Sequence, residues 1–315
     1  MTPPLRWLLM LLPFALWGTA MAAMAPLLAA APPLSLAALR LLPAGVALLL
    51  AAPLLGRPWQ VARADWAWLA LFTVVDASLF QGLLARGLVG TGAGLGSVLI
   101  DSQPLLVALL ARLLFGEAIN PVGWLGLLLG LAGILCLGLP APLLRHWLLQ
   151  GPEALGPAWG PGSLWMLAAA AAMAVGTVVS RYATRHSDPV AVTGWHLLLG
   201  GLPLAAGAGL GWLNPAGLPA WPHWSGAEWG LMAYASLFGS ALAYGLFFWF
   251  ASQGDLTGFT ALTFLTPVFA LLAGLGLLGE HLAPLQWLGV ALALVSVLLI
   301  NRRSQLWQPA AAAAP

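Results

Sequence analysis

Three charged residues, Arg40, Asp76 and Asp101, lie within long apolar runs. Placing any one of them in the centre of a bilayer costs roughly 2.5 to 3.5 kcal/mol, so each should find a partner. We expect Arg40 to neutralise one of the two carboxylates. The remaining acid should then be protonated or bind a cation, which gives the hypothesis that Asp76 or Asp101 takes up and releases a proton. The alternative is a static pair between Arg40 and a carboxylate that only orients helices.

The neighbours of Asp101 form a small, polar face at helical spacing. Its members are Gly94, Ser97, Asp101, Pro104 and Ala108. Pro104 cannot donate to the carbonyl of Ile100, and Pro267 likewise frees the carbonyl of Thr263. Both defects fall in the middle of apolar runs, where a freed carbonyl is tolerated if it meets protein, water or ligand.

Polar residues surround both proline breaks: Ser102, Gln103, Thr260, Thr263 and Thr266. Together with the prolines they predict two kinked helices that line a polar cavity. The alternatives are close helix packing through the small residues and threonine hydroxyls that bond back to their own helix.

Two matched polar stripes repeat at a spacing of four residues, Thr73-Ala77-Gln81 and Ser236-Ser240-Tyr244. We expect both to face inward, where they can exchange hydrogen bonds with a small polar substrate. Aromatic contacts are expected from Trp17, Trp195, Phe238 and Phe264. His196 can titrate near neutral pH, although a histidine used only for packing is the more ordinary interpretation.

The composition is that of an integral membrane protein. Charged residues make up 6% of the chain, against about 25% in soluble domains, and 61% of the residues are apolar. The net charge of +2 comes from eleven arginines against nine acids, without any lysine, which argues against nucleic-acid binding. The single cysteine, Cys136, has no intrachain partner and excludes an internal disulfide.

Ten apolar stretches are long enough to cross a bilayer as helices, which need about 20 residues each. They lie near residues 7 to 25, 34 to 55, 65 to 86, 92 to 115, 121 to 139, 163 to 182, 189 to 211, 227 to 250, 257 to 278 and 284 to 301. The first stretch has features of a signal peptide, but Trp17-Gly18-Thr19 has a counterpart in Val175-Gly176-Thr177. We therefore predict a permanent first helix.

Arginine placement predicts the orientation of the chain, because positive charge collects in cytoplasmic loops. With a cytoplasmic N-terminus, Arg86 and Arg145 lie outside. Eight arginines then lie inside: Arg6, Arg57, Arg63, Arg112, Arg181, Arg185, Arg302 and Arg303. Both termini are expected in the cytoplasm.

One segment occurs twice, as GEAINPVGWLG from residue 116 and as GEHLAPLQWLG from residue 279. At this offset of 163 residues, residues 104 to 135 and 267 to 298 share 12 of 32 positions. Each half therefore carries five spans, and because five is odd the halves must be inverted relative to each other. Inverted repeats of this kind recur in secondary transporters, with the substrate site near the middle of the membrane.

The repeat sets the expected domain boundaries. We expect a first repeat over residues 1 to 139, a linker over 140 to 161 that is rich in Pro and Gly, a second repeat over 162 to 303, and a short tail over 304 to 315.

The duplicated segment also has a local structural explanation. Gly116 can end one helix, Pro121 and Pro284 suit the first turn of the next, and Asn120 is a good N-cap. Glu117 and Glu280 then lie at connections on opposite membrane sides. We interpret both glutamates, like Pro104 and Pro267, as structural or hinge residues rather than catalytic ones.

Several motifs together resemble the EamA-type permeases of the drug/metabolite transporter superfamily. They are Phe14-Ala15-Leu16-Trp17-Gly18, Ala38-Leu39-Arg40, the mid-span Pro104 and Pro267, and the twin Gly-Glu-x-x-x-Pro-x-x-Trp-x-Gly junctions. The resemblance runs from about residue 7 to 301. It implies a ten-helix carrier of small metabolites in the cytoplasmic membrane, often an exporter of amino acids. The second junction departs from the first by having His281 and Ala283.

Two other functional classes remain as alternatives. A membrane-embedded enzyme would need chemistry that the sequence does not offer, since it has no His-Glu-x-x-His motif, no Asp-Asp-x-x-Asp motif and no phosphate-binding loop. A regulatory membrane protein without transport would not need polar residues in mid-membrane. We expect a secondary transporter without cofactor or metal, whose partners are a small-molecule substrate, the lipid bilayer and, under the proton hypothesis, protons. The substrate, the direction of transport and the oligomeric state stay open.

Overall fold

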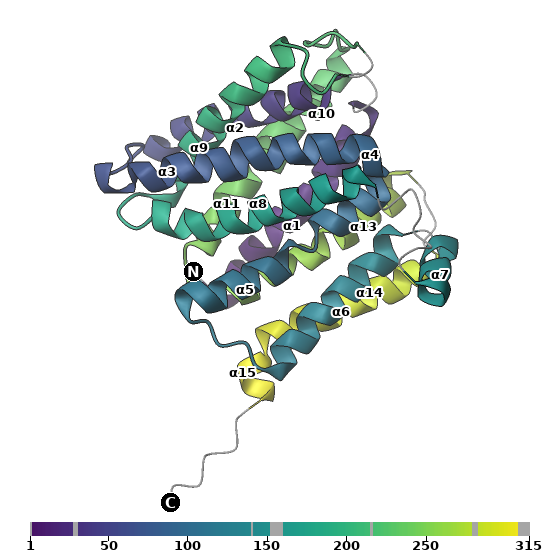
Figure 1. Cartoon of the computed structure of the whole chain (residues 1–315). Helices are drawn as coiled ribbons and strands as arrows, with labels where there is room; N and C mark the ends of the chain where they lie inside the picture. Colours follow the sequence, from purple (N-terminus) through teal and green to yellow (C-terminus); the bar gives the residue numbers. More distant parts are fainter. Residues whose placement is uncertain are drawn as a thin grey trace, which may run out of the picture.

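Helices account for all of the regular secondary structure that we describe (Figure 1). The structure is a computed structural model, and the description covers residues 2 to 27, 31 to 139, 141 to 151, 160 to 214, 217 to 278 and 283 to 307. Ten of its helical stretches are long and apolar enough to cross a membrane. The prediction of an all-helical membrane protein with ten spans is therefore confirmed.

The first half contains five candidate spans and one short helix in the linker. Its elements are α1 (Pro3–Met24), η1 (Ala25–Leu27), α2 (Pro33–Leu54), η2 (Arg63–Asp65), α3 (Trp66–Phe72), η3 (Thr73–Leu79), α4 (Phe80–Ile100), α5 (Gln103–Phe115), α6 (Pro121–Gly138) and the linker helix α7 (Ala141–Gln150). The sequence did not predict α7, because the Pro and Gly content of its surroundings indicates a loop.

The second half follows the same order. Its elements are α8 (Pro161–Ala183), α9 (Pro189–Gly209), α10 (Gly226–Ser236), η5 (Leu237–Leu242), α11 (Ala243–Ala251), α12 (Leu256–Thr260), η6 (Ala261–Leu265), α13 (Thr266–Leu278), α14 (Pro284–Asn301) and the short α15 (Arg303–Leu306).

One boundary differs from the expectation. Spans 3 and 4 were expected to separate near residues 87 to 91, yet α4 is helical from Phe80 to Ile100. The two membrane-length stretches, Arg63–Leu88 and Gly96–Phe115, both include part of this helix. Helical hydrogen bonding thus continues where a loop was expected, but the chain still turns back close to the expected place, because a β-carbon at Gly96 would lie 3.0 Å from Leu88 Cδ2, whereas eight residues of a straight helix span about 12 Å.

Prolines and polar caps define several helix starts. Proline occupies the first turn of α2, α6, α8, α9 and α14, where its missing N–H costs nothing. The side chain of Asn120 accepts from the backbone N–H of Gly123 at 2.9 Å, as its sequence context predicts. Gly116 ends α5 in the left-handed conformation, with φ of 67°.

The two halves interlock through pairs of equivalent helices, and α6 lies alongside α14 just as α2 lies alongside α9 (Figure 1). Glycines allow this close approach. A β-carbon added at Gly45 on α2 would lie only 2.5 Å from the backbone nitrogen of Leu198 on α9. One added at Gly289 on α14 would lie 2.8 Å from the carbonyl oxygen of Gly133 on α6. Small residues at such crossings are the usual basis of helix association in membranes.

Each half also contains a π-helix at the same place. The π-helix η3 covers Thr73–Leu79 in span 3, and η5 covers Leu237–Leu242 in span 8. The offset of 163 residues superimposes residues 74 to 79 on 237 to 242. π-Helices are rare and often mark functional sites. Their equivalent positions make spans 3 and 8 candidates for contributing to a functional site.

Candidate functional site

A cavity of about 210 Å³ lies between the two halves, and helices of both halves contribute to its wall. Seven of the ten residues predicted for substrate binding or coupling line it: Trp17, Arg40, Gln81, Ser97, Asp101, Tyr244 and Thr263. They come from α1, α2, α4, the break between α4 and α5, α11 and η6. The polar stripes of spans 3 and 8 meet at this cavity, where Gln81 Nε2 donates to the Tyr244 hydroxyl at 3.3 Å.

Both proline breaks lie at the cavity wall. α4 ends at Ile100 and α5 starts at Gln103, which leaves Asp101 and Ser102 between them. In the second half the tight turn η6 precedes α13, whose first residue is Thr266. Gln103 and Thr266 thus occupy equivalent helix starts, and both line the cavity. The start of a helix offers free N–H groups and a partial positive charge.

Several buried polar atoms of the cavity wall have no hydrogen-bond partner among the residues we describe. They are both amide atoms of Gln103, the hydroxyls of Thr263 and Thr266, and Nε1 of Trp17. Burying such an atom unpaired costs about 1 to 3 kcal/mol. Of the threonines near the second break, Thr260 does bond back to its own helix, at Leu256 O. Thr263 and Thr266 keep their hydroxyls available to a ligand.

The charges are paired differently from the expectation. Within the described part of the chain, no ion pair joins Arg40 to Asp76 or Asp101. Instead, Arg40 Nε donates to Ser240 Oγ at 3.1 Å, and the guanidinium lies 3.9 Å from the sulfur of Met24. The prediction that Arg40 neutralises one of these acids is wrong. The error arises from tertiary structure, because α9 places His196 against Asp76, a contact that the sequence alone does not show.

Asp76 lies next to His196, with 3.0 Å between Asp76 Oδ2 and His196 Nε2. Each side chain is only 1% exposed. No hydrogen bond joins these two described side chains, and the contact is an ion pair when the imidazole is protonated. His196 also stacks on Phe72, with ring centroids 3.8 Å apart. Neither Asp76 nor His196 lines the cavity, and they form a separate buried pair.

A glycine makes room for Asp76. A β-carbon at Gly176 on α8 would lie 2.5 Å from Asp76 Oδ1 and 2.8 Å from its Cγ. Oδ1 itself is buried without a hydrogen-bond partner among the described residues. The carboxyl group is therefore enclosed by α8 and α9, away from the lipid.

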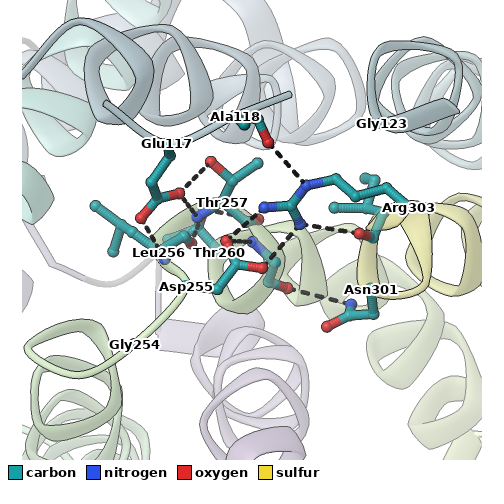
Figure 2. Close-up of polar contacts among 12 residues, drawn as sticks. Glu117, Ala118, Gly123, Gly254, Asp255, Leu256, Thr257, Thr260, Asn301 and Arg303 are labelled. Atoms are coloured by element: carbon teal, nitrogen blue, oxygen red, sulfur yellow. Dashed lines mark hydrogen bonds and ion pairs between the residues drawn. The ribbon is translucent and has the colours of Figure 1, made fainter. Parts of the chain in front are cut away.

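Glu117 ties the first half to the second. Its carboxylate accepts hydrogen bonds from the backbone N–H groups of Leu256 and Thr257, at 2.8 and 3.0 Å, and from the Thr257 hydroxyl at 2.7 Å (Figure 2). Arg181 lies 3.5 Å away. The carboxylate therefore caps the start of α12, a geometry that favours the structural interpretation of Glu117.

Asp255 and Arg303 extend the same cluster. Arg303 donates to both Asp255 oxygens at 2.8 Å (Figure 2). Asp255 also accepts from the backbone N–H of Gly258. Burial raises the pKa of Asp255, but the hydrogen bonds and charge of Arg303 outweigh it and hold that pKa below its ordinary value. Asn120 links back by donating to the carbonyl of Arg303. This cluster joins the loop between α5 and α6 to the start of α12 and the end of α14.

The second junction can be described only in part, because Glu280 lies outside the described residues. Pro284 stands in the first turn of α14, as Pro121 does in α6. Where Asn120 caps α6, Ala283 has no capping side chain. The side chain of Gln286 instead accepts from the Ala283 N–H at 2.9 Å. The capping group of α14 therefore comes from its first turn and not, as in α6, from the residue before the helix.

The two ends of the bundle differ. The ion pairs between described residues are Arg57–Asp188, His186–Asp65, Arg181–Glu117 and Arg303–Asp255, together with the buried His196–Asp76 pair. Because successive spans alternate in direction, the first four all lie at one end, which we call the ion-pair end. The cavity wall instead reaches Met24, Pro33 and Gly96 at the opposite end, which we call the cavity end. In Figure 1, α15 and α7 mark these two ends of α6.

Some cavity residues were missing from the predicted set. Gln103 and Thr266 flank the prolines and were expected near a polar cavity, but they were not among the ten residues predicted for substrate binding or coupling. Four methionines also line the cavity: Met21, Met24, Met166 and Met173. In an apolar sequence nothing distinguishes them from lipid-facing residues.

Comparison with known proteins agrees with this architecture. The model of the EamA-like transporter family matches residues 5–139 and 160–302. An uncharacterized transporter of Synechocystis sp. is 51% identical over 306 residues, covering 95% of this chain and 90% of the relative. A chloroplastic WAT1-related protein of Arabidopsis thaliana is 45% identical, covering 94% of this chain and 69% of the relative.

More distant similarities extend the picture. The inner membrane transporter YedA of Escherichia coli K12 is 28% identical, with 90% and 86% of the two chains covered. A crystal structure with 22% identity superimposes with a TM-score of 0.76 over 95% of this chain and 98% of the other, which shows the shared fold. With the family model matching both halves and two relatives above 40% identity, this chain belongs to the EamA-like transporter family.

Proposed function

We propose that the protein is a secondary-active transporter that exports or exchanges a small polar metabolite, with amino acids as the first class to test. The carrying observation is the cavity between the halves, in which buried polar atoms from both repeats have no hydrogen-bond partner among the described residues. A buried polar group costs free energy unless it is paired, so these atoms are best explained by a substrate. Arg40 and Asp101 add opposite charges to the same wall, which suits a zwitterion.

The two ends support alternating access as the mechanism. The cavity wall extends to the cavity end, whereas the halves are joined at the ion-pair end by Glu117, which binds Leu256, and by Arg303, whose carbonyl accepts from Asn120. To expose the substrate on the other side, these contacts must open as the halves rock against each other. The rocking units proposed are residues 1 to 139 and 162 to 303, joined by the linker over residues 140 to 161.

The orientation follows from charge. Arg57, Arg181 and Arg303 lie at the ion-pair end, and positive charge favours the cytoplasmic side. We therefore assign the ion-pair end and both termini to the cytoplasm of a cell membrane. The cavity in this structure then faces outward. Labelling of single exposed cysteines at residues 145 and 304 with a membrane-impermeant reagent tests this: only the first should react in intact cells.

Proton coupling is proposed for Asp101 or Asp76. Asp101 lines the cavity and has no ion-pair partner within the described chain. Asp76 has His196, so the static alternative now involves His196 rather than Arg40. The variants Asp101→Asn and Asp76→Asn separate these possibilities. If transport by both variants keeps the wild-type response to a pH gradient, neither carboxylate carries the proton.

The direct test is uptake and efflux in proteoliposomes that hold a pooled panel of amino acids and metabolites, with and without an imposed pH gradient. At least one compound should cross, and Asp101→Asn should change its pH response. If nothing crosses although the protein is folded, the transporter proposal fails for this panel.

A lock on the ion-pair end tests the mechanism separately. The Glu117 carboxylate contacts the Thr257 hydroxyl, so cysteines at these two positions, in a Cys136→Ala background, should be joined by a short, reducible bifunctional thiol reagent. The crosslink should stop transport, and reduction should restore it. An unchanged rate in the crosslinked protein would contradict alternating access.

A further inference from the structure

Gln103 is the most completely buried of the unpartnered polar residues in the cavity. It is the first residue of α5, directly after the break at Asp101 and Ser102, and it is 1% exposed. Both Nε2 and Oε1 lack a hydrogen-bond partner among the described residues. A glutamine amide can donate twice and accept at its oxygen. Here the whole of that capacity is available at the cavity wall.

The opposite repeat supplies two hydroxyls to the same cavity. Thr263 lies on η6 and is 3% exposed, and Thr266 begins α13 and is 5% exposed. Neither hydroxyl has a partner among the residues we describe, and a hydroxyl can rotate to donate or to accept. The two proline breaks thus bring uncharged hydrogen-bonding groups from both halves to one cavity.

The other glutamine of the cavity is arranged differently. Gln81 donates to the Tyr244 hydroxyl at 3.3 Å, so its side chain already has a partner in the protein. Charged groups of a substrate also have other partners, because Arg40 and Asp101 line the same cavity. Gln103, Thr263 and Thr266 therefore remain for an uncharged part of the substrate.

The pairing capacity of Gln103 selects among chemical groups. A carboxylate only accepts and would leave Oε1 unpaired, whereas an ammonium only donates and would leave Nε2 unpaired. An alkyl group would leave both atoms unpaired. A carboxamide offers a donor and an acceptor side by side, as Gln103 does, and satisfies both atoms. The threonine hydroxyls can then complete its remaining hydrogen bonds.

We propose that Gln103, Thr263 and Thr266 form a subsite that recognises an uncharged carboxamide on the transported solute. This inference rests on the proposed function, since it names the substrate class of the same cavity. A site built to hydrogen-bond a polar group discriminates strongly against an analogue that lacks the group, because its own buried atoms are then left unpaired. The subsite therefore determines specificity rather than adding general affinity.

Three amino acids of nearly equal shape test the subsite: L-asparagine, L-aspartate and L-leucine. They compete, in proteoliposomes, against the labelled solute that crosses in the panel experiment. For the wild-type protein, we expect the half-inhibitory concentration of asparagine to be at least about tenfold lower than that of leucine or aspartate. Gln103→Met keeps the length of the side chain and removes the amide. It should reduce the preference for asparagine by a factor of at least about ten.

A stability measurement tests the same residue without transport. Gln103→Met should raise the midpoint of thermal unfolding in detergent, because it replaces an unpaired buried amide with an apolar group. The matched variant Gln81→Met should lower the midpoint, because it breaks the hydrogen bond to Tyr244. A lower midpoint for Gln103→Met would show that Gln103 has a structural partner and would overturn the subsite.

Other outcomes also decide the question. Equal inhibition by asparagine and leucine, or an unchanged preference in Gln103→Met, would overturn the subsite, and a preference for aspartate would assign the position to a carboxylate. If panel solutes cross but none of the three competes, the subsite is wrong while transport stands. If no solute crosses, the proposed function fails. Asparagine must then still raise the thermal midpoint of the wild-type protein more than leucine does, and the lack of that shift overturns the subsite too.

Discussion

The π-helices η3 and η5 occupy equivalent positions in spans 3 and 8, but they carry different chemistry. In η3, Asp76 lies against His196. The equivalent residue in η5 is Gly239, which packs closely on Ala20 of α1. The next residue, Ser240, accepts from Arg40 and donates to Ala235 O. The backbone irregularity has thus been kept in both halves, whereas the titratable carboxyl is found in only one.

This difference separates two roles within one repeated design. The η3 region holds a buried pair away from the cavity, and the η5 region holds the side chain of a cavity residue, Arg40, in place. The two repeats thus share the π-helix but differ in the charged residue that it carries. The predictions below test this division of labour between η3 and η5.

The largest effect is expected from His196→Leu in the η3 region. It leaves Asp76 buried without a charge partner, which should lower the free energy of unfolding by about 3 to 5 kcal/mol. Unfolding in mixed micelles with increasing SDS measures this. The double variant Asp76→Asn/His196→Leu should recover much of the loss. A single variant as stable as the wild-type protein would show that the pair contributes nothing.

A smaller effect is expected from Ser240→Ala in the η5 region. This change removes the acceptor of Arg40 Nε, and a hydrogen bond to a charged group contributes about 1.5 to 3 kcal/mol. We expect a loss near the lower limit, because Arg40 lines the cavity, where its guanidinium is not enclosed by protein on every side. The same unfolding assay applies, and a loss as large as that of His196→Leu would remove the contrast between the two regions.

Thr73 and Ser236 offer a matched pair at equivalent positions. Ser236 Oγ donates to the carbonyl of Arg40 at 2.8 Å, whereas the Thr73 hydroxyl is buried without a partner among the described residues. Ser236→Ala should therefore cost about 1 kcal/mol, and Thr73→Val should be neutral or slightly stabilising. Equal destabilisation by both variants would indicate a partner for Thr73 and a closer symmetry of the two halves.

The smallest effect lies outside both π-helices, at Asp255. Its pKa is lowered in the folded protein, so its contribution to stability is present above the unfolded pKa of about 4. That contribution is lost as the pH falls through the lower folded pKa. The side chain is 45% exposed, so solvent screening should keep the contribution below about 1 kcal/mol.

A pH series of unfolding measurements tests this prediction. In Asp255→Asn, the free energy of unfolding should fall less steeply at acid pH than it does in the wild-type protein. The difference in stability between His196→Leu and Ser240→Ala should stay unchanged. If the stability of wild type and variant fell equally at acid pH, Arg303 would not stabilise the Asp255 carboxylate.

Much of the architecture was predictable from the chain. Runs of about 20 apolar residues can only be satisfied as helices in a bilayer, and the ten candidate spans follow from their lengths. The twin junctions at Gly116 and Gly279 revealed the duplication. The breaks at Pro104 and Pro267 were also predictable, because polar residues surround these prolines within the span. Proline alone was not sufficient, since Pro13, Pro43 and Pro203 lie inside continuous helices.

The charge partners were not predictable, and Arg40 is the clearest case. A sequence shows that a buried charge needs a partner, but it does not show which helix faces it. That is decided by the close approach of α8 and α9 to η3, which depends on Gly176 and Gly200 and places His196 on Asp76.

By itself, then, the sequence determined that this is a membrane protein and how many spans it has. It also determined the inverted repeat and the two mid-span helix breaks. Each of these depends on local composition or periodicity. Only the tertiary structure decided that Asp76 pairs with His196, that Glu117 caps α12, and that Gln103 lies at the cavity without a hydrogen-bond partner in the described part of the chain. Each of these contacts joins residues from different helices. Their positions are set by the way the two halves pack, which no local pattern contains.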